Sequence, residues 1–219
     1  MDRRTTYSSA AQSPAIEINK VLRNTYMLLA LTIGFSAITA TISMFLNVGM
    51  IGYFAMIIGG IISLFIVHKK ADSASGLAWV FVFTGLFGGA LGPLLSMYFA
   101  AGAGHVVAQA LAATAVVFFT LSGYALVTKK DFSFLGGFLM VGLVVAIIGI
   151  IANIFLAIPA MSMAISALVV FIMSGLILFD TSRIIHGGET NYIRATVGLY
   201  LNIYNIFIHL LALIGMGED

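Results

Sequence analysis

The chain has 219 residues, of which 61% are hydrophobic and only 8% are charged. A soluble domain carries about 25% charged residues, so this chain has too few to cover a water-exposed surface and is expected to lie in a membrane. A formal net charge of +2 excludes a basic stripe for nucleic acid, and the absence of cysteine excludes disulfides, thiolate catalysis and Cys-based metal sites.

Residues 1–23 form a polar N-terminal tail ahead of the first apolar segment. The tail lacks the apolar core and small-residue cleavage site of a secretory signal peptide, so the first apolar segment is interpreted as an uncleaved anchor. Ser13-Pro14 predicts the start of a helix, because Ser is a favoured N-cap and Pro fits the first helical position. The residues before Ser13 are expected to be disordered.

Residues 24–219 are predicted to form a seven-helix transmembrane domain. A hydrocarbon core about 30 Å thick is crossed by roughly 20 helical residues. No segment alternates with a period of two, as barrel strands do, so the fold class is an all-α integral membrane protein. The predicted spans are residues 26–46, 48–67, 77–99, 106–127, 134–156, 160–179 and 193–214.

The basic residues are distributed unevenly over the predicted connections. With seven spans, the tail and the second, fourth and sixth connections share one face, and all ten Lys and Arg residues fall on it. The positive-inside rule then places the N-terminus in the cytoplasm and the C-terminus on the external side.

Small residues in the third span suggest two roles. Gly88 and Gly92 form a face that favours close helix packing. The same stretch ends at Pro93, and Pro removes a backbone hydrogen bond, so a hinge or a break in the helix is the alternative.

Few polar groups lie at membrane depth, where they are costly and become candidates for function. Asp180 lies near the inner end of the sixth span, whereas Asn202, Asn205 and His209 share one face of the seventh. One interpretation is hydrogen bonding between helices. The other is a polar path or gate that closes near Asp180. Asn153 of the fifth span fits either role.

The charge state of Asp180 is also open. If burial outweighs the nearby cations, Asp180 holds a proton near neutral pH and acts as a latch. Otherwise it is ionised and paired with Arg183 or Arg194. The cytoplasmic loop candidates after the sixth span are Arg183, His186, Glu189 and Arg194. The spacing of His186 and Glu189 is only a weak metal pattern, so no metal or other cofactor is predicted.

The motifs of membrane enzymes are absent. The sequence contains no P-loop, no His-Glu-x-x-His zinc motif and no Gly-x-Ser-Gly nucleophile. Intramembrane aspartyl proteolysis needs two carboxylates, and only Asp180 lies at depth. We therefore expect a protein that is not an enzyme.

Four runs of residues resemble one known family. They are Lys129–Leu135, Phe179–Ser182, Ile184–Val197 and Leu199–Phe207. These runs and the seven-span layout are similar to the Bax inhibitor-1 (transmembrane Bax inhibitor motif) family, and the third run resembles its bacterial YccA branch.

The resemblance implies two functions. Members of the YccA branch are inner-membrane partners and negative regulators of the FtsH protease, with its other membrane regulators as further candidate partners. Other members form a pH-sensitive leak, with calcium as the permeant ion, latched by two aspartates on the last two helices. Asp180 matches the first of these aspartates and is the candidate gate residue, but Asn202 stands where the second is expected. An Asp–Asn pair cannot share a proton between two carboxylates, so the modulator function is preferred and the leak is the alternative.

The N-terminal tail is consistent with the modulator function. A processive protease driven by ATP needs a chain end to engage, and the polar segment Met1–Gln12 offers one on the predicted cytoplasmic side. Our hypothesis is that the protein competes for the protease as a tightly packed substrate that is degraded slowly.

Overall fold

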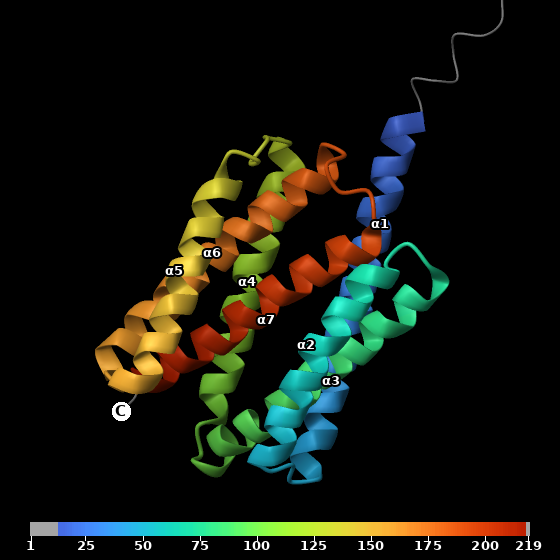
Figure 1. Ribbon diagram of the computed structural model, residues 1–219. Coiled ribbons are helices and arrows are strands. Elements are labelled where there is room, and N and C mark those ends of the chain that lie inside the picture. The colour runs from blue at the N-terminus through green and yellow to red at the C-terminus, as the bar shows by residue number, and fades with distance from the viewer. Residues whose placement is uncertain (1–12, 218–219) are drawn as a thin grey trace, which may run out of the picture.

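The computed structural model describes residues 13–217, so the tail segment that we expect to be disordered lies outside the described residues. The described part contains seven helices, and each is long and apolar enough to cross a membrane. This arrangement confirms the all-α, seven-helix class (Figure 1). The helices are α1 (Ser13–Phe45), α2 (Met50–Lys70), α3 (Ala74–Ala100), α4 (Gly104–Thr128), α5 (Leu135–Leu156), α6 (Pro159–Ile185) and α7 (Tyr192–Met216).

Helices α1 and α6 extend farthest beyond their predicted spans at the polar end. Helix α1 begins at Ser13, where Ser13-Pro14 predicts a helix start. Helix α6 continues to Ile185, six residues past the predicted end of its span, because Ile184 is buried in the core and holds the last turn in place. Arg183 and Arg194 were predicted as loop candidates, but both lie in helices. Arg183 is near the end of α6, and Arg194 is near the start of α7, where the predicted span 193–214 had also placed it. Asp180 is therefore within a helix rather than at its end.

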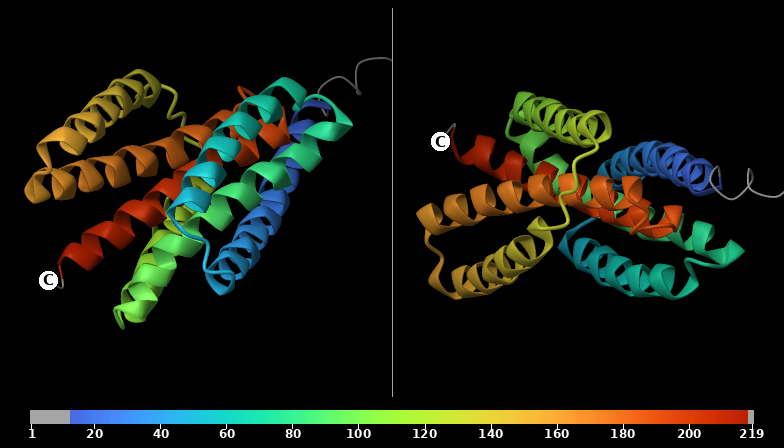
Figure 2. Two further views of the ribbon diagram at one scale, coloured as in Figure 1. Left: turned by 60° about the horizontal axis from the view of Figure 1, so that its bottom comes forward. Right: turned by 90° about the horizontal axis from the view of Figure 1, so that it is seen from above.

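Helix α7 lies at the centre of the bundle. It crosses between one group formed by α1, α2 and α3 and a second group formed by α4, α5 and α6 (Figure 2). Helices α1, α4 and α6 all pack against it. A central position explains why α7 carries more polar residues than a lipid-facing helix tolerates, since its side chains find partners on neighbouring helices.

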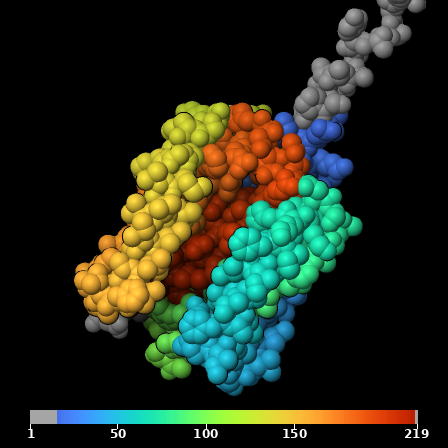
Figure 3. Space-filling view, in the orientation of Figure 1, coloured from blue at the N-terminus to red at the C-terminus, as the bar shows by residue number. Residues whose placement is uncertain are grey.

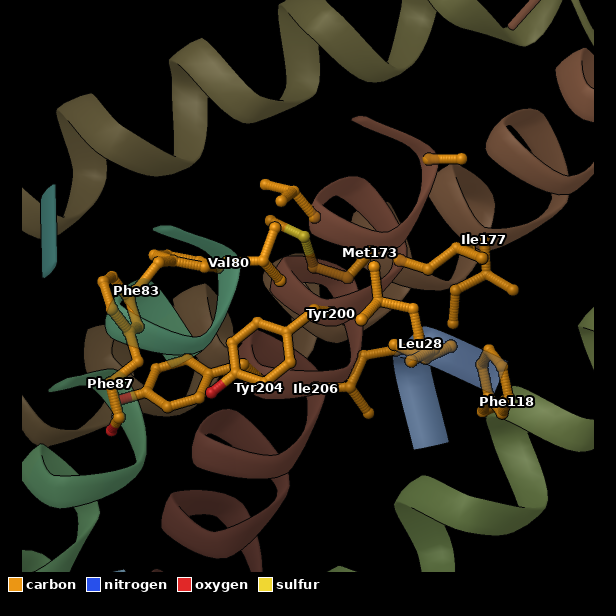
Figure 4. Packing of buried hydrophobic residues seen from close by; sticks show 14 of the residues in the cluster. Leu28, Val80, Phe83, Phe87, Phe118, Met173, Ile177, Tyr200, Tyr204 and Ile206 are labelled. Carbon is orange, nitrogen blue, oxygen red and sulfur yellow. The ribbon is translucent and has the colours of Figure 1, made fainter. Parts of the chain in front are cut away.

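The core is formed by rings from α3 packed on rings from α7 (Figure 4). The ring centroid of Phe83 lies 5.3 Å from that of Tyr200, and the centroid of Phe87 lies 5.0 Å from that of Tyr204. The Tyr204 hydroxyl donates to the carbonyl oxygen of Phe87 at 3.3 Å. Tyr200 lies 2.8 Å from the Ser36 hydroxyl. These partners satisfy the buried phenol groups, so the rings contribute apolar area without an unpaired polar atom.

Helices α1 and α3 approach each other closely at the small-residue face. A Cβ atom on Gly88 would lie 2.5 Å from the Ser36 Cα atom, and one on Gly92 would lie 2.5 Å from the Ser43 side chain. Helix α3 also continues through Pro93 to Ala100 without a break. The glycines of this stretch therefore serve packing against α1.

One end of the bundle carries the basic residues. Arg3 and Arg4 lie outside the described part, and the other eight of the ten Lys and Arg residues occur at the start of α1 or α7, at the end of α2 or α6, or just after α4. We call this the basic end. It is the upper end in Figure 1, where the chain enters α1, and the C-terminus lies at the opposite end.

Candidate functional site

The structure brings Asp180 and Asn202 together. The Asn202 side-chain amide donates a hydrogen bond to Asp180 Oδ2 at 2.8 Å, and Asn202 is buried. Gly198 lies one turn before Asn202 on α7, and a Cβ atom there would lie 3.1 Å from Asp180 Oδ2. The missing side chain at Gly198 thus gives the carboxyl group room against α7.

A polar cavity adjoins this pair toward the basic end. Its volume is about 270 Å³, and it lies between α2, α6 and α7. Figure 3 views the molecule from the side on which α7 is visible between α2 and α5. The titratable or charged residues that line the cavity are His68, Asp180, Arg183, Glu189 and Arg194. Such a cavity has room for water or a small ion beside a carboxyl group.

The two arginines that line the cavity pair with loop acids. Arg183 Nη2 lies 3.8 Å from Glu189 Oε2 and donates to the Gly188 carbonyl oxygen at 3.3 Å. Arg194 forms an ion pair with Asp72, at the start of the connection between α2 and α3. Among the described residues Asp180 forms no ion pair, and its hydrogen-bond partner is the neutral amide of Asn202.

The pair limits what the site can do with protons. It contains one carboxyl group and one amide, so a proton cannot be shared between two acids. The amide instead satisfies one oxygen of Asp180 in a poorly hydrated region, where an unpartnered carboxyl group is costly. The geometry therefore provides a hydrogen-bonded contact between α6 and α7.

Asn191 ties the start of α7 to the connection between α2 and α3. Its side-chain oxygen accepts hydrogen bonds from the backbone N–H groups of Ile193 at 2.8 Å and Arg194 at 3.2 Å. Its amide donates to the Ala71 carbonyl oxygen at 3.0 Å and to Asp72 Oδ1 at 2.7 Å. One side chain therefore caps a helix and joins two connections at the basic end.

We expect Asn191→Ala to lower the free energy of unfolding by about 1–2 kcal/mol, because the helix loses its N-cap. Asp72→Ala serves as the matched control, since it keeps the cap and removes only two exposed contacts, the ion pair with Arg194 and the hydrogen bond from the Asn191 amide. An exposed ion pair contributes about 1 kcal/mol or less. Unfolding of the purified protein in detergent by circular dichroism measures both. A larger loss in Asp72→Ala would show that the cap is not the main contribution.

Ser182 holds the connection between α4 and α5. Its hydroxyl accepts from the backbone N–H of Phe132 at 2.9 Å and donates to the Lys130 carbonyl oxygen at 3.2 Å. In the same connection a hydrogen bond from the Ser133 backbone N–H lowers the pKa of Asp131, so this carboxyl group stays ionised. The connection is thereby fixed over the end of α6.

The predicted polar residues do not form one continuous row. Asn205 donates to the carbonyl oxygen of Leu201 in its own helix at 2.8 Å. His209 Nδ1 lies 3.1 Å from the Ser166 hydroxyl of α6. Asn153 of α5 donates to the Ser162 hydroxyl at 2.6 Å and accepts from the Ile158 backbone N–H at 3.0 Å. The contacts of His209 and Asn153 join neighbouring helices or cap a helix end, whereas the contact of Asn205 stays within α7.

Sequence reasoning assigned four residues to the connection after the sixth span, and three of them line the cavity. The exception is His186, whose Nδ1 atom lies 2.9 Å from the Ser182 carbonyl oxygen. Two residues of this region were missed, namely His68 in the cavity wall and Asp72 beside it. Both follow a lysine-rich helix end or form part of it, and nothing in that pattern separates them from ordinary solvated residues.

Comparison with known proteins gives matches over nearly the whole chain. Residues 18–219 match the family described as inhibitor of apoptosis-promoting Bax1 (Bax1-I). The chain is 53% identical over 211 residues to the modulator of FtsH protease YccA of Escherichia coli K12, with 96% of each chain covered. It has the same identity and coverage to the inner membrane protein YccA of Escherichia coli O6:H1. An uncharacterized membrane protein of Vibrio cholerae is 49% identical over 203 residues, which is 92% of this chain and 91% of that protein. None of these three names describes an enzyme.

Proposed function

Because the chain belongs to the Bax inhibitor-1 family of multi-pass membrane proteins, we propose that it binds the membrane protease FtsH and restrains the degradation of membrane substrates. The observation that carries this proposal is the 53% identity, over 96% of each chain, to a protein named as a modulator of FtsH protease. A match over 96% of the chain extends across all seven helices.

The packing of the helices supports a mechanism in which this chain is itself degraded slowly and thereby restrains FtsH. A protease that pulls on one chain end has to unfold the bundle helix by helix, and α7 is held by neighbours on several sides. The Asn191 cap and the Asp180–Asn202 hydrogen bond add polar ties at the basic end. A chain that unfolds slowly occupies the protease and delays other substrates.

The charge distribution supports an orientation for this encounter. The basic end carries eight of the ten Lys and Arg residues, and Arg3 and Arg4 precede it in the sequence. By the positive-inside rule we assign this end and the N-terminus to the cytoplasm, and the C-terminus to the periplasm. The tail then faces the compartment in which ATP is available.

The site favours this function over a proton-latched calcium leak. The leak mechanism requires two carboxyl groups that share a proton, and the pair here has only that of Asp180. A partner-binding function makes no such demand, since it uses the pair as a fixed contact between α6 and α7.

Reconstitution with the protease tests the proposal. Purified FtsH and a multi-pass membrane substrate are placed in vesicles with or without this chain, and an unrelated multi-pass protein at the same density is the control. We expect the chain to co-purify with FtsH and to lower the initial rate of substrate loss, whereas the control protein does neither. An unchanged rate, or a chain that fails to co-purify, would contradict the proposal.

A further inference from the structure

A second cavity lies on the opposite side of α7 from Asp180 and opens toward the membrane. It is a groove of about 1040 Å³ between α1 and α4, near the upper end of the roughly 300–1,000 Å³ that ligand sites occupy. In the described chain, no Cα atom of α1 lies within 8 Å of a Cα atom of α4. The right-hand view of Figure 2 shows these two helices lying apart. Helix α7 therefore forms the floor of the groove, between α1 and α4.

Hydrocarbon side chains line the groove almost throughout. Ile33 of α1, Leu95 of α3 and Phe119 of α4 contribute to its walls, and Ile203 of α7 contributes to its floor. Two small residues that line it, Ala37 on α1 and Ala115 on α4, leave it wide, and both are exposed. The chemistry of the lining fits an apolar chain, because most lining residues are hydrocarbon and the hydroxyl groups of Ser36, Thr114 and Tyr204 already bond within the protein.

The groove is bridged by hydroxyl groups toward the basic end. Tyr26 of α1 forms a hydrogen bond with Ser122 of α4, and the Thr181 hydroxyl of α6 lies 3.5 Å from each of them. The Tyr26 ring packs on Phe118, with 6.2 Å between the centroids. Tyrosine at this depth is typical of the boundary between hydrocarbon and headgroups.

Positive charge flanks the groove beyond this bridge. Arg23 lies about one turn before Tyr26 on α1, and Lys129 directly follows α4, seven residues after Ser122, which is about 10 Å along the helix axis. Both side chains are exposed. The neighbouring charged residues in the two segments are Lys20 and Lys130, which are basic, and Glu17 and Asp131, which are acidic. The local charge is therefore positive.

We propose that the groove between α1 and α4 binds the hydrocarbon chains of an anionic phospholipid, with the phosphate at Arg23 and Lys129. A phospholipid carries its negative charge at one end of two long apolar chains, which matches a basic mouth above an apolar trough. A transmembrane helix of a partner would fill the trough but would not account for the charge at one end. The proposal is independent of FtsH, and its tests use the chain alone.

Filling the groove tests the binding of the apolar chains. The protein is purified in detergent with equal amounts of phosphatidylglycerol and phosphatidylcholine, and bound lipid is read by native mass spectrometry. We expect phosphatidylglycerol to be retained by the natural chain and lost from the double variant Ala37→Phe, Ala115→Phe. Ala112→Phe is the matched control, because Ala112 is exposed on α4 but does not line the groove. Retention of lipid by the double variant would overturn the proposal.

Removing charge tests the headgroup contact. Arg23→Gln with Lys129→Gln is expected to weaken the preference for phosphatidylglycerol by about fivefold for each charge removed. Lys69→Gln with Lys70→Gln is the control, since these exposed lysines end α2, whose Cα atoms are not within 8 Å of those of α1 or α4. Equal retention of both lipids by the natural chain, or equal effects of the two pairs of substitutions, would contradict the proposed headgroup site.

A measurement in vesicles avoids any loss of lipid or of fold in detergent. Trp79 is the single tryptophan of the chain, so Trp79→Phe allows one reporter to be placed by Phe119→Trp, which keeps an aromatic ring on the groove wall and does not fill the groove, with Ala112→Trp as its control. Brominated phosphatidylglycerol should quench the reporter in the groove at a lower mole fraction than brominated phosphatidylcholine does. At the control position the two lipids should quench equally. The same quenching curves for both lipids at Phe119→Trp would rule out a selective site.

Discussion

Gly88→Ala should lower the free energy of unfolding by about 3 kcal/mol, at the upper end of what overpacking of a core usually costs. The new Cβ atom would lie 2.4 Å from Thr39 Oγ1 and 2.5 Å from both the Cα and the carbonyl oxygen of Ser36. A flexible side chain can move away, but the backbone of α1 cannot do so locally. The two helices therefore have to separate.

The separation would reach beyond this contact. The Ser36 hydroxyl donates to the Thr84 carbonyl oxygen at 2.7 Å and contacts the Tyr200 hydroxyl at 2.8 Å. A shift of α1 at Ser36 pulls on α3 and on the central helix α7 together. We expect the variant to unfold at a lower temperature in detergent and to be recovered in lower yield from membranes.

Gly123→Ala is the matched control for this prediction. Gly123 also lies inside a helix, but a Cβ atom there would have nothing within 4 Å. Alanine should be neutral or should stabilise α4 by about 0.5–1 kcal/mol, because glycine is the poorer helix former. Circular dichroism during thermal unfolding compares the two variants. Equal melting temperatures would show that α1 can yield at Gly88.

The helices of this fold could be predicted because the membrane makes local hydropathy decisive. Runs of about 20 apolar residues have to form helices in lipid, where every backbone group needs an internal partner. The close-packing face at Gly88 and Gly92 was also evident from spacing. Its partner helix was not, since the pattern in α3 does not say that Ser36 of α1 lies against it.

The sequence predicted the arrangement of the candidate site only where its residues lie on a single helix. Spacing placed Asn202 and His209 on one face of α7, and both contact α6. The same spacing included Asn205, whose side chain instead turns to the carbonyl oxygen of Leu201. Helical periodicity gives the direction in which a residue leaves the helix, but the rotamer depends on which partner is within reach.

Contacts between connections that are far apart in the chain could not be predicted from the sequence. Asp72 and Arg194 form an ion pair although 122 residues separate them in the chain. Asn191 reaches the same connection across 120 residues. A single sequence contains no signal for such pairs, because exposed acids and amides occur in most polar loops. The structure reveals these contacts, and they connect the helices and connections at the basic end.

Removal of residues 1–12 should abolish the proposed restraint of FtsH and leave the bundle folded. The deletion ends just before Ser13, where α1 begins, and the segment is polar in sequence. If the protease engages the chain through this end, the shortened protein offers it no starting point. In vesicles the degradation of a membrane substrate should return to the rate measured without the chain.

Two controls separate a missing tail from a damaged protein. Deletion of residues 217–219 shortens the chain at the other end of the bundle, and it should leave both binding and restraint unchanged. Replacement of residues 1–12 by a Gly/Ser segment of equal length keeps a chain end without its sequence. Full restraint by this variant would show that length is enough, whereas loss of restraint would assign recognition to the residues themselves.

Three readouts decide the role of the tail. Co-purification with FtsH measures binding, turnover of the chain measures its use as a substrate, and substrate loss measures restraint. Competition by a slowly degraded substrate requires all three to fall together on deletion, since each depends on the same engagement. If binding persists while turnover stops, the contact with FtsH lies in the membrane helices, and the tail is needed only for degradation. Unchanged values for all three would refute engagement through residues 1–12.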